Sequence, residues 1–523
     1  MKIRILILLT AVLSITLTSC KKMLDVQSSR LVSEANMYKS VEDARAGLMG
    51  IYGLARAAFC DNDRHWIYGD LRTALKQGGD FRSVTRLDLK SISENKLQAA
   101  FPIVESLSDW RRFYAVINAA NIFLERAPGI VQSDARYLPQ DLKLDVAHAR
   151  YLRAFAYFYI VRIWGDVPFI ITSHDGQFEN KPRENQQTVL AFVESELLAA
   201  AADLPRVYNA NQPEQTRTPY YAIEEEIAKK HSAYAVLAHV YAWQGKYAQA
   251  ATWAKWVLDN MALPAESMFY MNVDQSRQMF RGEYGTNQFN IIAGFSHMFL
   301  NAESGSSGFL EELTLAAPYV INKPLPAIYV PKDSILSIFN LANDQRFSID
   351  RITSSPTSDK YFGAFDRTYP IFTKVFIIRD NNPPVNTVTG NGSDGSMTQY
   401  ASSVVFTRPE DMALLLAEAR VVLGDAAGAT QLLNERRSTG PGNRGLTLYD
   451  PLVDGSLIDA IFKERRKELM GEGWRWYDLI RYKRIKNNDP AFNALIQNGG
   501  IYWPVSKAVL AQNPLLEQTT YWK

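Results

Sequence analysis

Residues 231–260, HSAYAVLAHVYAWQGKYAQAATWAKWVLDN, decide the fold, because they have the pattern of two helices joined by a tight turn. In each half, apolar residues recur at the spacing of one helix face. These residues are Tyr234, Leu237, Ala238 and Tyr241 in the first half, and Ala250, Trp253, Ala254 and Val257 in the second. Between the halves, Gly245 can adopt the positive φ that a tight helix stop requires. The stretch therefore predicts a helical hairpin.

Small and aromatic residues at these offsets around a glycine turn resemble a tetratricopeptide hairpin. The pattern returns 179 residues later, where Leu416, Ala417, Gly424 and Ala429 match Leu237, Ala238, Gly245 and Ala250. One such unit cannot bury its apolar face alone, so several are expected to stack. Two further pairs fit, residues 149–164 with 187–204 and residues 41–58 with 110–127. Ordinary amphipathic helices are the alternative.

The predicted fold class is therefore mostly α, with about four tetratricopeptide-like hairpins. From Met268 to about Ser403 the helical period fades, and short apolar runs indicate a few strands between loops rich in glycine and proline. Residues 59–108 also have an irregular pattern. We expect these less regular segments to form a loop-rich half that faces a ligand.

The N-terminus has the composition of a secretory signal. Lys2 and Arg4 precede an apolar run over residues 5–17, which is too short to span a bilayer with its requirement of roughly 20 residues. The following Leu17-Thr18-Ser19-Cys20 resembles a bacterial lipobox. We therefore expect residues 1–19 to be removed and Cys20 to be lipidated, with acyl chains such as palmitate as the membrane anchor. A plain signal peptide with an accidental cysteine is the alternative.

Charge gives no support for nucleic-acid binding, and the cysteine content excludes a disulfide-rich protein. The chain has 57 Lys and Arg against 55 Asp and Glu, and removal of the signal with its two basic residues makes it neutral. A neutral chain gives no electrostatic indication of nucleic-acid binding. Cys20 and Cys60 are its two cysteines, so a disulfide framework is excluded.

Several stretches together resemble the RagB/SusD-like family of nutrient-binding outer-membrane lipoproteins. The most specific lies at residues 464–481, with ERRKEL followed by EGWRWYDL. Two departures are Trp164, where the family commonly has Phe, and the chain end, which lacks the usual Gln-Asn-Pro-Gly-Tyr. The other matching stretches are RYLRA at 150–154, WGDVP at 164–168, residues 408–436, Trp503-Pro504, and Gln512-Asn513-Pro514.

The resemblance implies a helical protein anchored by lipid in the outer membrane and facing outward. It would act as a lid on a SusC-like TonB-dependent transporter, capturing an oligosaccharide or a peptide without chemistry and without a cofactor. We divide the mature chain into an N-terminal region, residues 20–290, and a C-terminal region, residues 291–523. The resemblance also implies that the ligand contacts the segment after the first helix and the irregular middle of the chain.

A search for catalytic motifs yields no strong candidate. The sequence has no Gly-x-Ser-x-Gly elbow, no His-Glu-x-x-His and no phosphate-binding glycine loop. Asp61, Asp63 and His65 lack the glycine and terminal glutamate of a calcium loop, so we predict a polar loop and no metal. The charged residues of 464–478 are interpreted as a structural network, with Arg475 and Asp478 able to pair at i, i+3. A secreted glycan-processing enzyme and a tetratricopeptide adaptor without a small ligand are the alternative functions.

A glycan site needs exposed aromatic rings flanked by polar groups. Aromatic residues on predicted helix faces, Tyr234, Tyr241 and Trp253, are expected in the core, whereas those in irregular segments are better candidates. Trp66 is the first choice, because Asp63, Arg64 and Asp70 accompany it. The predicted ligand-binding residues are Trp66, Tyr68, Asp70, Tyr284, Tyr361 and Phe362.

Overall fold

The computed structural model describes ten segments of the chain. They are residues 37–72, 80–97, 101–173, 180–208, 228–263, 266–282, 290–297, 303–350, 352–379 and 398–523. The predicted signal peptide, Cys20 and Tyr284 lie outside these segments. Among the described helices, none combines the length and apolarity needed to cross a bilayer.

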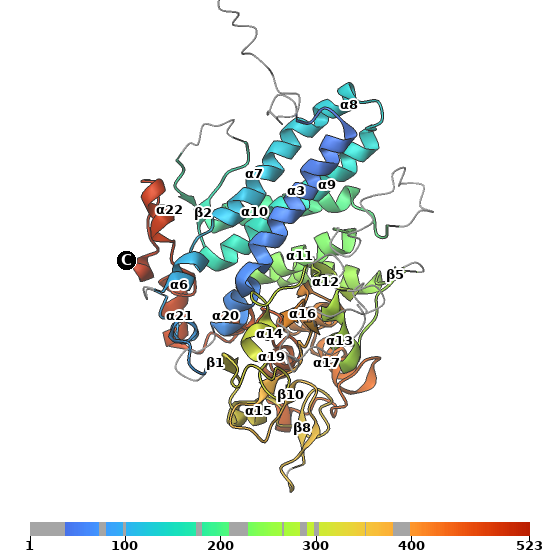
Figure 1. Cartoon of the computed structure of the whole chain (residues 1–523). Coiled ribbons are helices and arrows are strands. Elements are labelled where there is room, and N and C mark those ends of the chain that lie inside the picture. Colours follow the sequence, from blue (N-terminus) through green and yellow to red (C-terminus); the bar gives the residue numbers. More distant parts are fainter. Residues whose placement is uncertain are drawn as a thin grey trace, which may run out of the picture.

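Eight helices form four helical hairpins that stack in chain order, and each helix packs against the next (Figure 1). The prediction of four hairpins is confirmed. The pairs are α3 (Val41–Cys60) with α7 (Arg111–Arg126), α9 (Pro139–Trp164) with α10 (Gln186–Asp203), α11 (Lys230–Trp243) with α12 (Tyr247–Asp259), and α16 (Pro409–Val422) with α17 (Ala426–Asn434). The fourth pair packs against α12, so the stack includes helices from both halves of the sequence.

The turn of the α11–α12 hairpin has the geometry that its sequence predicts. Gly245 has a φ of +78°, a left-handed conformation that is cheap for glycine and strained for other residues. Ala238 and Ala250 are fully buried, and their small side chains leave room for the two helices to pack closely. Gly424 has a φ of +88° in the equivalent turn between α16 and α17.

Most of the remaining helices are shorter than those of the stack. They include three within residues 59–108, so the interpretation of that stretch as irregular is wrong in part. These helices are α4 (Arg64–Trp66), α5 (Leu87–Ser93), α6 (Pro102–Leu107), α8 (Ile130–Ser133), α13 (Val273–Gln278), α14 (Leu310–Thr314), α15 (Lys332–Ile338), α18 (Pro451–Asp454), α19 (Leu457–Glu468), α20 (Arg475–Lys486), α21 (Pro490–Gln497) and α22 (Lys507–Gln512). Single helical turns are η2 (Asp61–Asp63), η3 (Ile67–Leu71), η4 (Ala127–Gly129), η6 (Met279–Arg281), η9 (Glu435–Thr439) and η10 (Thr520–Trp522).

Each sheet in the described segments is a pair of short antiparallel strands, as expected for the less regular half. The pair β6–β14 joins the middle of the chain to the segment that enters α16. The pairs are β1 (Arg82–Ser83) with β7 (Ile328–Tyr329), β2 (Val167–Pro168) with β3 (Arg183–Glu184), β4 (Ala262–Leu263) with β5 (Glu266–Ser267), β6 (Ala293–Phe295) with β14 (Val404–Thr407), β8 (Ser348–Ile349) with β9 (Pro356–Ser358), β10 (Phe362–Gly363) with β11 (Ile371–Phe372), and β12 (Ile378–Arg379) with β13 (Gln399–Tyr400).

A buried ion network lies where α19 and α20 meet α16. The Glu468 carboxylate accepts hydrogen bonds from the guanidinium groups of Arg408 at 2.9 Å and Arg444 at 2.5 Å. The predicted pair between Arg475 and Asp478 is wrong, because Asp478 accepts hydrogen bonds from other arginines and Arg475 faces Asp80 at 3.2 Å. Such buried charges are stable only when each is paired and hydrogen-bonded.

Candidate ligand-binding site

The chain turns sharply at the C-terminal end of α3. Asn62 and Asp63 both adopt left-handed conformations, with φ values of +59° and +56°. Such conformations strain residues other than glycine, although Asn and Asp tolerate them best, and they often occur at functional sites. The turn leaves Asn62 exposed and directs α4 and η3 into the interior, so that Asp63 lies at the boundary, half-buried.

The opposite wall comes from the irregular middle of the chain. The Ser402 hydroxyl donates a hydrogen bond to the Glu311 carboxylate at 2.6 Å, and the backbone N–H of Ile377 donates to the same group at 3.1 Å. The His297 Nδ1 lies 2.9 Å from the carbonyl oxygen of Ser402. The His297 ring packs edge-on against Phe309, with centroids 5.1 Å apart. These contacts hold four distant segments as one wall.

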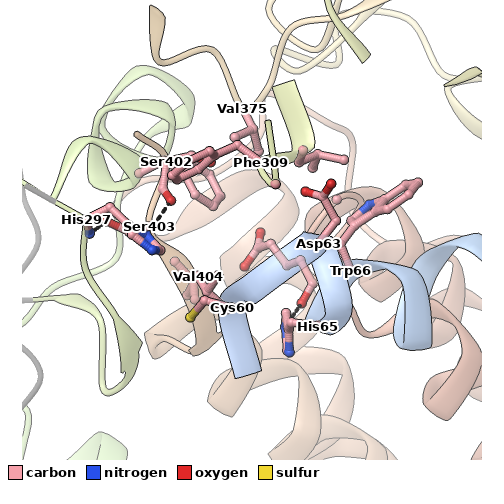
Figure 2. A pocket seen from close by; sticks show the side chains of 16 residues that line it. Cys60, Asp63, His65, Trp66, His297, Phe309, Val375, Ser402, Ser403 and Val404 are labelled. Atoms are coloured by element: carbon pink, nitrogen blue, oxygen red, sulfur yellow. Dashed lines mark hydrogen bonds between the residues drawn. The ribbon is translucent and has the colours of Figure 1, made fainter. Parts of the chain in front are cut away.

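A small cavity lies between the two walls (Figure 2). Its volume is about 40 Å³, and Asp63, Trp66, His297, Phe309 and Ser402 are among the residues that line it. That volume accommodates a group the size of a water molecule and not a sugar ring. The cavity can therefore bind one substituent of a ligand whose remaining atoms lie outside it.

The pKa values of the ionisable groups at the cavity are shifted mainly by burial. Burial raises the pKa of Asp63 well above its ordinary value, and the neighbouring carboxylates Glu312 and Glu311 raise it further. Burial raises the pKa of Glu311 to about 7. Burial also lowers the pKa of both His65 and His297 to about 4, so both rings are neutral at pH 7. The cations Arg86 and Lys323 lower the pKa of Asp63 in part, so charges of both signs act on this carboxyl group.

Trp66 is the predicted ligand residue that borders this cavity. Its side chain is only 4% exposed and packs edge-on against Phe81, with ring centroids 5.1 Å apart. It therefore offers no open ring face for stacking on a sugar. Its indole Nε1 is buried and has no hydrogen-bond partner among the described residues. The part of Trp66 available to a ligand is thus this N–H group.

Tyr68 and Asp70 are buried farther inside. The Tyr68 hydroxyl donates to the carbonyl oxygen of Leu107 at 2.5 Å, and its ring packs against Trp503 with a centroid distance of 5.1 Å. The Asp70 carboxylate accepts hydrogen bonds from the backbone N–H groups of Gly473 at 2.9 Å and Arg475 at 3.0 Å. In this structure both side chains connect the segment after α3 to the rest of the fold.

Tyr361 and Phe362 are also fully buried. Phe362 packs against Phe347 and Phe372 with centroid distances of 5.7 Å and 5.5 Å, and the Lys374 ammonium lies 5.1 Å from the Tyr361 ring centroid. Neither ring is exposed, so stacking on a ligand would require a rearrangement. The consecutive residues Tyr361, Phe362 and Gly363 are all buried, which the loop-like composition of this segment does not indicate.

Two rings that sequence pattern placed in the core are instead partly exposed. Tyr234 and Trp253 lie on the outer face of α11 and α12, stacked with centroids 4.3 Å apart and an interplanar angle of 19°. Trp256 packs edge-on against Tyr234 at 4.5 Å. Helical spacing could not distinguish these positions from core positions, because each helix packs on two sides. Tyr241, the third residue of that group, is buried as expected.

The polar loop of Asp61, Asp63 and His65 does not converge on one point. Asp61 pairs with Arg112 at 2.7 Å on the surface, and His65 bonds to Tyr159 and to the carbonyl oxygen of Glu472. Across the segments that the structure describes, no group of three His, Cys, Asp or Glu side chains is arranged to hold a metal ion.

Comparison with known proteins identifies the family. A protein-family sequence model described as "SusD family" matches residues 383–522. A second family model, described as "Starch-binding associating with outer membrane", matches residues 88–242. A SusD superfamily protein of Bacteroides thetaiotaomicron with a known crystal structure is 40% identical, with a TM-score of 0.79 over 93% of this chain and 100% of that one. The chain belongs to the SusD family.

Other SusD relatives agree over most of their length. SusD-like protein P38 of Formosa agariphila is 26% identical and aligns over 96% of this chain and 95% of its own. SusD-like protein P25 of the same organism is also 26% identical, over 89% of this chain and 87% of its own. A second SusD homologue of Bacteroides thetaiotaomicron, 21% identical, shares the fold with a TM-score of 0.72. The resemblance inferred from residues 464–481 is confirmed.

Proposed function

We propose that this protein is a surface glycan-binding lipoprotein of the outer membrane that delivers its ligand to a SusC-like TonB-dependent transporter. The observation that carries the proposal is the match to a family described as starch-binding and associated with the outer membrane. The lipobox-like Leu17-Thr18-Ser19-Cys20 supports attachment through lipid at Cys20. The ligand is an oligosaccharide, with a peptide as the alternative nutrient.

The architecture supports binding without chemistry. The charged residues of 464–481 form a buried network in which each carboxylate faces arginines, such as Glu468 between Arg408 and Arg444, so they are committed to the scaffold. The cavity beside Asp63 has neutral histidines, and none of the carboxylates among its described lining residues forms an ion pair with them. We therefore assign the protein a binding role, in agreement with the family description.

Calorimetric titration against a panel of oligosaccharides and peptides tests this function. We expect at least one neutral oligosaccharide to bind and to be recovered unchanged by chromatography after prolonged incubation. Recovery of shortened products would support the glycan-processing alternative. If no member of the panel binds, the binding function is wrong.

A separate experiment tests delivery to the transporter. When the protein and its transporter are expressed together at native levels, gentle detergent extraction followed by pull-down should recover a large outer-membrane β-barrel protein. A Cys20→Ser variant serves as the control for association through the membrane alone. Recovery of the protein as a monodisperse monomer would contradict the partnership and leave the glycan-binding function intact.

A further inference from the structure

The indole N–H of Trp66 is a hydrogen-bond donor without an acceptor. The side chain is only 4% exposed, and its Nε1 has no partner among the described residues. Leaving a buried donor unpaired costs about 1–3 kcal/mol, so such a group is retained where something else satisfies it. In Figure 2 the indole nitrogen lies on the edge of the ring that faces Asp63.

The Asp63 carboxylate is the complementary acceptor. It forms no hydrogen bond or ion pair with the residues that the structure describes, and it is half-buried where the chain turns after α3. Asp63 and the neighbouring Asn62 both have a left-handed backbone, directly before the buried helix α4. A donor and an acceptor thus line one cavity of about 40 Å³ without contacting each other.

The chemistry of this pair selects the group that fits between them. A hydroxyl both accepts a hydrogen bond, here from the indole N–H, and donates one, here to the carboxylate. An ammonium group only donates and would leave the indole unpaired. A carboxylate or sulfate only accepts, so it cannot donate to the Asp63 carboxylate. A water molecule meets the same requirement as a hydroxyl.

We propose that Asp63 and the Trp66 indole N–H bind one hydroxyl group of a glycan. This inference rests on the proposed glycan-binding function and specifies how one group of the ligand is held. The hydroxyl enters the cavity and displaces water, while the sugar ring stays outside because the cavity is too small for it. Asp63 is thereby a specificity-determining residue, and Trp66 acts through its N–H and not by stacking.

The test uses the mature chain and two variants that change one group each. Trp66→Phe keeps an aromatic ring and removes the N–H, whereas Asp63→Asn removes the charge and tolerates the left-handed backbone. Calorimetry with the neutral oligosaccharide found in the panel should show at least a tenfold loss of affinity for each variant. The affinity of the double variant should be no more than about twofold lower than that of the single variant that binds more weakly. The two effects are not additive because both groups bind the same hydroxyl. Asp61→Asn, the same change in the exposed part of the turn, is the matched control and should retain the affinity.

One further measurement separates this proposal from a structural role. The indole N–H resonance of Trp66 is assigned in a ¹⁵N spectrum as the one that is missing in Trp66→Phe. Added ligand should shift this resonance in the wild-type protein, a result that does not depend on variant stability. The inference is overturned if either single variant keeps wild-type affinity or if the Trp66 resonance does not move. A panel that yields no ligand at all would instead overturn the proposed function on which this inference depends.

Discussion

Gly245 and Gly424 hold the same left-handed conformation, with φ values of +78° and +88°, at equivalent turns of two helical hairpins. A β carbon at either position would meet no atom within 4 Å, so steric contact does not explain the glycine. The backbone conformation alone requires it.

We expect Gly245→Ala to lower the free energy of unfolding by about 1 kcal/mol, because alanine is strained at positive φ. Gly50→Ala is the matched control, since Gly50 lies in α3 and a β carbon there also meets no atom. In a helix that change should raise the free energy of unfolding by about 0.5–1 kcal/mol. Chemical denaturation measures both, and equal effects of the two substitutions would contradict the conformational explanation.

Gly69→Ala tests the contact between η3 and the segment that precedes α20. A β carbon at Gly69 would lie 1.7 Å from the carbonyl oxygen of Gly473, a backbone atom held in place beside the Asp70 hydrogen bond. We expect a loss of at least about 2 kcal/mol in the free energy of unfolding, or failure to fold. Gly53→Ala in α3, where a β carbon meets nothing, should be tolerated. Wild-type stability of Gly69→Ala would show that this close approach is absent in solution.

Glu311→Gln should change how stability depends on pH. Burial raises the pKa of Glu311 to about 7 in the folded protein. A raised pKa means that Glu311 contributes fully to the free energy of unfolding below its ordinary pKa near 4.5, and that this contribution is lost as pH rises through about 7. Between pH 4.5 and pH 8, we therefore expect the free energy of unfolding of the wild type to fall by up to about 3 kcal/mol relative to that of Glu311→Gln. Urea unfolding of both proteins across this range measures the difference, and a difference that does not vary with pH would contradict the raised pKa.

Cys20 should carry the lipid anchor. We expect mass spectrometry of the mature protein to show a new N-terminus at Cys20 with diacylglycerol attached and residues 1–19 absent. Cys20→Ser should release the protein from the membrane fraction, because the lipid chains supply the anchoring free energy. An unmodified Cys20, or a Cys20→Ser protein that stays membrane-bound, would exclude this attachment. Cys60→Ser is the control, since Cys60 is buried at the end of α3.

The four hairpins could be predicted because their signal is local. Spacing of apolar residues, small residues at helix crossings and a glycine at each tight turn are properties of about 30 consecutive residues. The ion network around Glu468 was partly predictable for the same reason, since its charges cluster in one stretch. The wrong pair, Arg475 with Asp478, shows the limit of such local prediction. Helical spacing permits this contact, but Arg475 pairs with Asp80, which is far away in the sequence.

The sequence by itself determined the helical repeats, the family and the lipobox-like segment at Cys20, because each depends on neighbouring residues. Only the tertiary structure decided which polar and aromatic groups are available to a ligand. Asp70 is committed to a backbone group 403 residues away, and the pKa of Asp63 is raised by burial and by Glu312 and Glu311 on a different segment. The N–H of Trp66 is unpaired because of what surrounds it in the fold. Burial and hydrogen-bond pairing depend on segments that meet only after folding, and residue type does not encode them.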